Sequence, residues 1–262
     1  MSSNIILPPA MLGMLGGGQL GRFFVIAAHE MGYRVTVLDP DKNSPAGKIA
    51  DVHLCAAYDD AAALKTMAET CQAITTEFEN VPASTLENLA QTRTVRPSAK
   101  AVSIAQHRVL EKQFIRDAGI PVAPFFVVNV ASDLPVDGEA IYPAILKVAR
   151  FGYDGKGQVR VKDAEALRTA WKDLQQVPCV LEKMLPLALE CSVIVARGRD
   201  GQMVNFPVQR NLHREGILAV TEVYEGHLPQ TLQAQAVAAA RAIAEGVNYV
   251  GVLCVEFFVL QD

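Results

Sequence analysis

The stretch AILKVARFGYDGKGQ, residues 144–158, joins an apolar strand pattern to a loop with three glycines in six residues. Glycines this closely spaced do not pack a core, and their N–H groups can surround phosphate oxygens. Lys147 in the strand and Lys156 in the loop add positive charge. The P-loop pattern G-x-x-x-x-G-K-[ST] is absent. The stretch therefore predicts either a phosphate-binding lid or a flexible hairpin with solvated lysines.

The next apolar strand pattern, Cys179–Glu182, ends at a carboxylate and continues as Lys183-Met184-Leu185. A strand end that crosses into another module suits a nucleoside pocket. Backbone groups at Lys183 and Leu185 would read the adenine edge, and the Glu182 carboxylate would bind ribose hydroxyls.

A third strand pattern, Val250–Leu260, contains one carboxylate, Glu256. Alternation along a strand places Glu256 on one face with Val252, Cys254 and Phe258. We expect this face to be buried, and a buried carboxylate needs a cation partner. A salt bridge and a metal both satisfy that need, and beside a phosphate site the metal would be magnesium.

Near the N-terminus, residues 16–21 read GGGQLG and fit the pattern G-x-G-x-x-G between a strand and a helix. Asp39 follows Gly21 by 18 residues at a strand end. The pattern is typical of dinucleotide-binding folds. It also fits a purely structural turn or a site for another ligand's phosphate, and Asp39 before Pro40 suits either a ribose contact or a turn.

The order of patterns along the chain predicts a mixed fold of α/β and α+β type. Alternating strands and helices in the first hundred residues predict a parallel sheet, Rossmann-like, covered by helices. A helix over 98–118 ends at Gly119-Ile120-Pro121. A small α+β module follows, and then antiparallel strands over 191–196, 203–208 and 217–223 precede an alanine-rich helix over 229–245. We expect domains at residues 1–120, 121–185 and 186–262.

Composition excludes several classes of protein. The net charge of −4 gives no overall basic character for binding nucleic acid. The five cysteines lack the spacing of a metal knuckle, so we expect reduced thiols in a cytoplasmic protein. No apolar run reaches the ~20 residues of a membrane span, and a secretory signal is not expected.

Taken together, these residues resemble the ATP-grasp superfamily and, within it, the 5-(carboxyamino)imidazole ribonucleotide synthases. The resemblance covers essentially the whole chain. Its most specific motifs are GGGQLGR (16–22), TTEFENVP (75–82), RVLEKQ (108–113), FGYDGKGQ (151–158), NLHREGIL (211–218) and GVLCVEFFV (251–259).

The resemblance implies an ATP-grasp fold with an N-terminal substrate-binding domain, a small lid domain and a C-terminal ATP-grasp domain. The implied substrate-binding residues are Gly18, Gln19, Leu20 and Glu77, and Glu256 is the implied magnesium ligand. The implied catalytic residues are Lys147, Tyr153, Asp154 and Lys156. The implied ATP-binding residues are Arg108, Lys147, Gly152, Tyr153, Asp154, Gly155, Lys156, Gly157, Gln158, Glu182, Lys183, Met184, Leu185, Glu190 and His213.

The implied reaction is carboxylation of aminoimidazole ribonucleotide, driven by ATP with Mg²⁺ and bicarbonate, through carboxyphosphate. The nucleotide phosphate would lie at the Gly18–Gly21 turn. A homodimer is also implied. The related formate-using glycinamide ribonucleotide transformylase has Glu-Leu-Gly-Lys where this chain has Gln19-Leu20-Gly21-Arg22, and it lacks the Gly-Tyr-Asp pattern.

Family members continue with an Asn-Glu pair, which supplies a second magnesium ligand, and with a His-rich segment. Neither follows Glu256 here, so we expect a C-terminal ATP-grasp domain that is incomplete and a 262-residue chain with little or no carboxylating activity. A non-catalytic nucleotide-binding fragment is one alternative. An oxidoreductase that uses the N-terminal glycine turn is another, although it would have no need of the second glycine loop.

Overall fold

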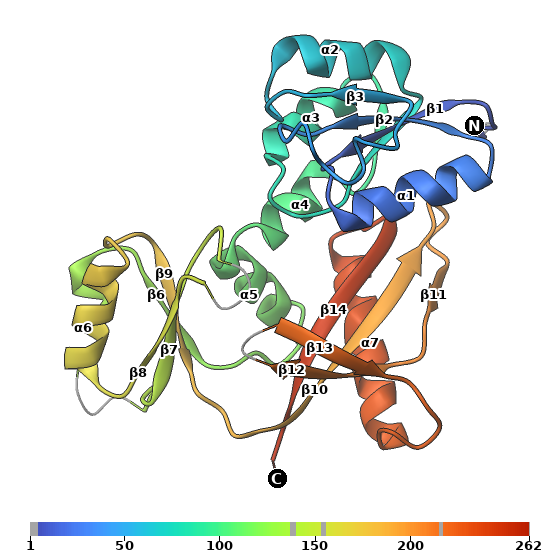
Figure 1. The fold of residues 1–262 in the computed structure, drawn as a ribbon. Helices are drawn as coiled ribbons and strands as arrows, with labels where there is room; N and C mark the ends of the chain where they lie inside the picture. Colours follow the sequence, from blue (N-terminus) through green and yellow to red (C-terminus); the bar gives the residue numbers. More distant parts are fainter. Residues whose placement is uncertain (1–4, 137–139, 153–155, 215–216, 262) are drawn as a thin grey trace. The chain divides into compact units, whose positions relative to one another are not determined.

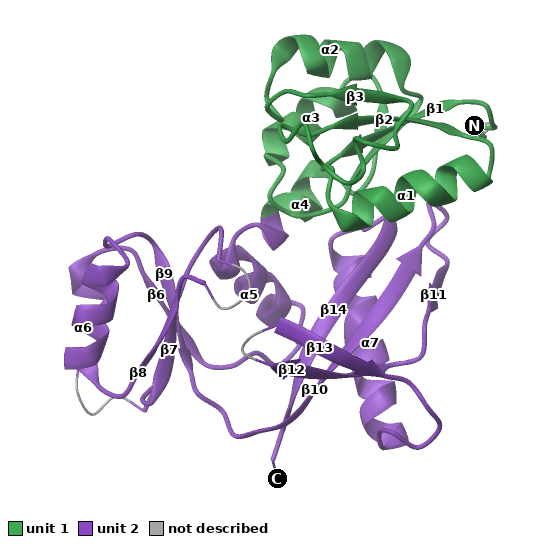
Figure 2. Ribbon diagram, viewed as in Figure 1, with its two compact units in different colours: residues 1–103 green, residues 104–262 purple. Residues whose placement is uncertain are grey.

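The computed structural model describes residues 5–136, 140–152, 156–214 and 217–261. The chain divides into two compact units, residues 1–103 and 104–262 (Figure 2). Residues 104–120, which we assigned to the first domain, belong to the second unit. The further division of that unit at residue 185 stays a prediction.

Unit 1 is a parallel sheet of five strands in the order β3-β2-β1-β4-β5 (Figure 1). Neighbouring residues of β1 face opposite sides, so Met14 packs with Val25 of α1 while Leu15 packs with Leu64 and Leu86 of α2 and α3. The predicted sheet with helical cover is confirmed. Its elements are β1 (Met11–Leu15), α1 (Gln19–Glu30), β2 (Arg34–Leu38), β3 (Val52–Leu54), α2 (Ala61–Thr70), β4 (Ala73–Thr76), α3 (Ala83–Ala90), β5 (Thr94–Val95) and α4 (Ala99–Ala105).

The first part of unit 2 is an antiparallel sheet in the order β6-β9-β7-β8. Helix α6 covers one face through Leu167 and Trp171, and α5 packs on the other through Val109. The elements are α5 (Arg108–Asp117), β6 (Phe125–Val128), the 3-10 turn η1 (Ala131–Asp133), β7 (Ala144–Val148), β8 (Gln158–Val161), α6 (Ala164–Asp173) and β9 (Cys179–Lys183).

The predicted helix over 98–118 is two helices, α4 and α5. It breaks at His107, whose backbone is extended with φ −131° and ψ 105°. The N–H of Arg108 donates to the carbonyl of Ala149, just beyond β7, at 2.9 Å instead of continuing a helix. Helix α5 is thereby attached to the β6–β9 sheet.

The second part of unit 2 is an antiparallel sheet in the order β11-β10-β12-β13, with β14 paired to β10. Helix α7 lies against β10 and β14 (Figure 1). The predicted strand over 203–208 stops at Asn205, and a polar strand that we did not predict follows Pro207 and Val208. The elements are β10 (Leu187–Arg197), β11 (Met203–Asn205), β12 (Gln209–Arg214), β13 (Ile217–Glu222), α7 (Gln230–Gly246) and β14 (Gly251–Leu260).

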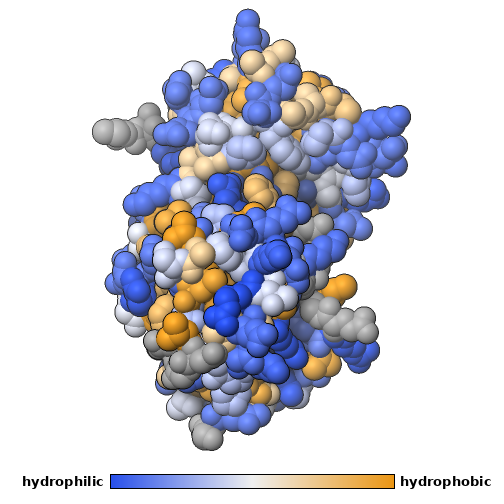
Figure 3. All heavy atoms as spheres, turned by 90° about the vertical axis from the view of Figure 1, so that its left-hand side faces the viewer, coloured by the Kyte–Doolittle hydropathy of each residue, from blue (hydrophilic) through white to orange (hydrophobic). Residues whose placement is uncertain are grey.

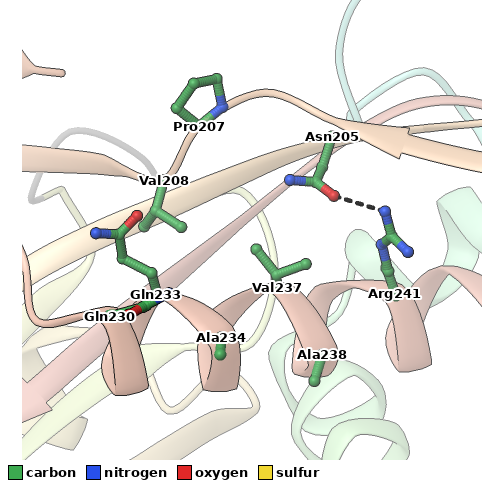
Figure 4. A pocket seen from close by; sticks show the side chains of 9 residues that line it. All are labelled: Asn205, Pro207, Val208, Gln230, Gln233, Ala234, Val237, Ala238 and Arg241. Carbon is green, nitrogen blue, oxygen red and sulfur yellow. Dashed lines mark hydrogen bonds between the residues drawn. The ribbon is translucent and has the colours of Figure 1, made fainter. Parts of the chain in front are cut away.

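A shallow groove of about 480 Å³ lies between α7 and the segment Asn205–Val208 (Figure 4). Arg241 donates to the Asn205 side chain at 2.8 Å across one end of it. None of the predicted ATP-binding or substrate-binding residues lines this groove.

The face of the molecule drawn in Figure 3 mixes hydrophilic side chains with small groups of hydrophobic ones. Within the described part of the chain, none of the helices combines the length and apolar character that crossing a membrane requires.

The β6–β9 sheet depends on Leu146, which is fully buried against α6. We expect Leu146→Ala to lower the free energy of unfolding of unit 2 by about 2–5 kcal/mol, because the substitution leaves a cavity. Urea denaturation followed by circular dichroism measures this loss. Val204→Ala, at a side chain that is 69% exposed, is the control and should change stability by less than ~0.5 kcal/mol. Equal losses in the two variants would contradict the assigned core.

Candidate active site

The glycine turn of unit 1 is organised by an internal carboxylate. Glu77 follows β4, and its two carboxylate oxygens accept hydrogen bonds from the N–H groups of Gly18 and Gly21, at the start of α1. Helix N-termini carry unsatisfied N–H groups that favour an anion. Here that anion is Glu77, so these two donors are not free for the substrate phosphate that we placed at this turn. Gln19 and Leu20 are exposed beside it.

Two glycines of the turn allow this close approach. Gly16 has φ +104°, and a Cβ there would lie 2.5 Å from Cγ of Glu77. A Cβ on Gly18 would lie 2.7 Å from Oε1 of Glu77. The glycine pattern is therefore explained by contacts within unit 1.

Asp39 is a structural acceptor in the same unit. Its buried carboxylate accepts from the N–H of Gly17 at 2.7 Å, the N–H of Asp41 at 2.8 Å and the hydroxyl of Tyr58 at 2.8 Å. Burial, followed by the hydrogen bond to Asp39, raises the pKa of the Tyr58 hydroxyl. The Asp39 carboxylate thus accepts hydrogen bonds from three donors of unit 1. In a dinucleotide site, the same carboxylate would bind a ribose.

A lysine–glutamate–lysine cluster lies on the face of the β6–β9 sheet that α5 covers. Glu182 Oε2 lies 2.9 Å from Nζ of Lys147, and Oε1 lies 3.4 Å from Nζ of Lys112. The three side chains are between 8% and 15% exposed. Both oxygens of Glu182 thus contact ammonium groups, and the ribose contact that we expected from this carboxylate stays a prediction.

The glycine loop begins beside the same helix. Arg108 donates from Nη2 to the carbonyl of Gly152 at 3.0 Å. Gly157 has φ +71°, and its carbonyl accepts from the N–H of Val148 at 2.8 Å. The remaining predicted loop residues divide into Lys156 and Gln158, which are exposed, and Tyr153, Asp154 and Gly155, which lie outside the described residues.

The segment after β9 leaves one backbone donor for an adenine ring. The N–H groups of Lys183 and Met184 donate to the carbonyls of Pro124 and Pro143, each at 2.9 Å. Among the described residues, the N–H of Leu185 has no backbone partner. Of these three donors, only Leu185 can read an adenine acceptor.

The sheet face opposite α7 carries a group of polar side chains on β10 and β12. Nδ1 of His213 on β12 lies 2.8 Å from Oε2 of Glu190 on β10, an ion-pair contact without hydrogen-bond geometry. Asn211 donates to Ser192 at 2.9 Å, and Ser192 donates to Gln209 at 3.2 Å. These cross-strand contacts hold β10 and β12 in register.

Glu256 lies on this face, directly across from Ser192 in the β10–β14 ladder. The alternation that we predicted is correct, but the burial is reversed. Glu256 and Phe258 are exposed, whereas Val255, Phe257 and Val259 pack towards α7. Within the described ranges no group of three or more His, Cys, Asp or Glu side chains could hold a metal ion. A single exposed carboxylate fits magnesium only together with phosphate oxygens and water.

Two family models match the chain in succession. Residues 10–106 match the ribonucleotide synthetase preATP-grasp domain, and residues 113–262 match the ATP-grasp domain. The N5-carboxyaminoimidazole ribonucleotide synthase of Brucella melitensis is 40% identical over 269 residues, which cover all of this chain and 73% of that protein. The protein of the same name from Bacillus subtilis is 37% identical, and the match covers 69% of its length.

The chain belongs to the N5-carboxyaminoimidazole ribonucleotide synthase family.

Solved structures of N5-carboxyaminoimidazole ribonucleotide synthases have the same fold. An ADP complex of one such synthetase has a TM-score of 0.90 at 39% identity over 98% of this chain and 68% of that one. The Aspergillus clavatus synthase in complex with ADP and 5-aminoimidazole ribonucleotide has a TM-score of 0.85 at 29% identity, over 96% of this chain and 66% of that one. The predicted ATP-grasp fold is confirmed, and the chain is an ATP-grasp ligase.

Within each unit, the structure of this synthase-family chain brings several predicted residues together in pairs. Glu77 contacts Gly18 in unit 1, while in unit 2 Lys147 contacts Glu182 and Glu190 contacts His213. Sequence reasoning missed Lys112, although it lies in the quoted motif RVLEKQ. Its spacing of four residues from Arg108 places both cations on one face of a helix, which was the available signal.

We expect Glu77→Gln to destabilise unit 1 by about 1–3 kcal/mol, because one of the two N–H donors would then face an amide NH₂ instead of a carboxylate oxygen. Thermal unfolding measures the loss. The control is Glu87→Gln, at an exposed position on α3, which should leave the melting temperature nearly unchanged. A melt of Glu77→Gln that coincides with the wild type would contradict the role of Glu77 in the turn.

We expect Gly157→Ala to weaken ATP binding about tenfold or more, because a Cβ there would lie 2.6 Å from Cγ2 of Val148 and would displace the loop. Gly226→Ala is the matched control, since Gly226 has a similar φ of +79° but no atom within 4 Å of the added Cβ. Isothermal titration with ATP and Mg²⁺ compares the two variants. Equal effects would show that the loss comes from the backbone angle alone.

Proposed function

We propose that the protein carboxylates the amino group of 5-aminoimidazole ribonucleotide, with ATP and bicarbonate as co-substrates, in purine biosynthesis. The observation that carries this proposal is the buried cluster of Lys147, Lys112 and Glu182 beside a glycine loop, in a chain that belongs to this synthase family. Clustered cations and loop N–H groups are what transfer of a phosphoryl group requires.

In the proposed reaction, a bicarbonate oxygen attacks the γ-phosphorus of ATP, and ADP leaves. The resulting carboxyphosphate donates its carboxyl group to the amine, which loses a proton as phosphate departs. Lys147 and Arg108 offset negative charge on the phosphates, and the loop 152–158 excludes water from the labile intermediate. The Leu185 N–H reads adenine, and Glu190 with His213 faces the nucleotide.

Unit 1 would bind the ribonucleotide through the exposed side chain of Gln19, the backbone of Leu20 and the Glu77 carboxylate. Since Glu77 already holds the N–H groups of Gly18 and Gly21, it presents a fixed acceptor to the ligand. Glu256 would hold a magnesium ion together with phosphate oxygens, and that ion would offset phosphoryl charge. We also propose that the protein is a cytoplasmic homodimer.

The reaction is tested with the complete gene product, radiolabelled bicarbonate, ATP, Mg²⁺ and 5-aminoimidazole ribonucleotide. We expect acid-labile label on the ribonucleotide, with one ADP and one phosphate released per label. Phosphate release that requires formate and glycinamide ribonucleotide instead would assign the protein to the related transformylase reaction and contradict the proposal.

Ligand binding by the 262-residue chain separates a ligase from an oxidoreductase. We expect ATP with Mg²⁺ at about 100 times its Kd to stabilise the protein by ~2.7 kcal/mol, whereas NAD and NADP should give no shift. A thermal shift assay reads all three ligands. Stabilisation by NAD alone would contradict the conclusion that contacts within unit 1, and not a dinucleotide, account for the glycine turn.

A further inference from the structure

Helix α5 carries two cations on the face that packs against the β6–β9 sheet. Arg108 contacts the carbonyl of Gly152 at the start of the glycine loop, and Lys112, one turn later, reaches Glu182. Val109 of α5 is buried against Val180 of β9 and attaches the helix to the sheet. A single helix thus contacts both the loop and the carboxylate that holds Lys147.

The cluster of Lys112, Lys147 and Glu182 contains more positive than negative charge. Two ammonium groups share one carboxylate, and Lys112 is only 14% exposed. Burial lowers the pKa of Lys112, the Glu182 carboxylate raises it, the like charge of Lys147 lowers it, and the neighbouring Glu111 carboxylate raises it to a smaller extent. An unbalanced buried cation is costly unless an anion joins it.

We propose that Lys112 is a positioning residue of the ATP site. By taking one oxygen of Glu182, it weakens the hold of that carboxylate on Lys147, so that the Lys147 ammonium group can contact a phosphate of ATP. This inference relies on the proposed function only in taking ATP as the ligand.

A purely structural role for Lys112 makes a different prediction. Lys112 Nζ also lies 5.5 Å from the centre of the Phe125 ring, a cation–π contact that would help to attach α5 to β6. If attachment were its only role, replacing Lys112 would lower stability without changing ATP affinity, and its effect would not depend on Glu182.

The first test compares the affinity of three variants for the β,γ-imido analogue of ATP with Mg²⁺, measured by isothermal titration. We expect Lys112→Met to raise Kd about tenfold, since both oxygens of Glu182 would then hold Lys147 and compete with the phosphate for its ammonium group. Lys112→Arg keeps the charge and should stay within ~3-fold of the wild type. Lys172→Met is the control, because Lys172 is exposed on α6, at the opposite face of the same sheet.

The second test repeats Lys112→Met in the Glu182→Gln background. If Lys112 acts through the carboxylate, its loss there should change Kd less than ~3-fold. The same tenfold loss in both backgrounds would overturn the proposal in favour of a direct contact with ATP, and no loss in the wild-type background would overturn it in favour of a structural lysine. Lys112→Gln replaces Lys112→Met if the apolar variant does not fold. Carboxylation is not measured, so failure of the proposed reaction would leave this result standing.

Discussion

Glu182 places one carboxylate between the ammonium groups of Lys147 and Lys112, at 2.9 and 3.4 Å, where little solvent reaches any of them. This contact depends on the register of β9, which lies between β6 and β7 in the sheet. A shift of one residue would turn Glu182 towards the apolar core under α6 and bring Leu181 to the polar side. The pairing of both neighbouring strands therefore fixes the charge arrangement that we propose as part of a nucleotide site.

Unit 1 uses the same physical device with backbone donors. Glu77 satisfies N–H groups at the start of α1, and Asp39 satisfies the N–H of Gly17 before it. An internal carboxylate holds a turn in one geometry without any ligand, so binding does not have to order the turn first. In each unit, acceptors within the protein thus set the position of the groups that we propose as ligand contacts.

Much of this fold follows from local patterns. Apolar strands bounded by glycines or prolines predicted the parallel sheet, the position of Lys147 and the strand that ends at Glu182. Strand β12 was missed because Gln209 and Asn211 are polar yet buried, and they satisfy one another only through Ser192 on β10. The contact between Lys112 and Glu182 likewise depends on how α5 packs on a sheet whose strands come later in the chain. The spacing of residues within α5 does not predict that packing.

Glu256 shows what the alternation of residues along a strand predicts and what it does not. The period of two correctly groups Glu256 with Cys254 and Phe258, but it does not say which face is covered. The helix α7 decides that, because its apolar stripe needs Val255 and Phe257. Glu256 and Glu190 are consequently left on the opposite face, where two carboxylates repel a triphosphate. Nδ1 of His213 lies 2.8 Å from Glu190, and within the described residues no ion pair involves Glu256. A cation bound together with the nucleotide would remove that repulsion, which is the physical reason that ATP should enter this site with magnesium.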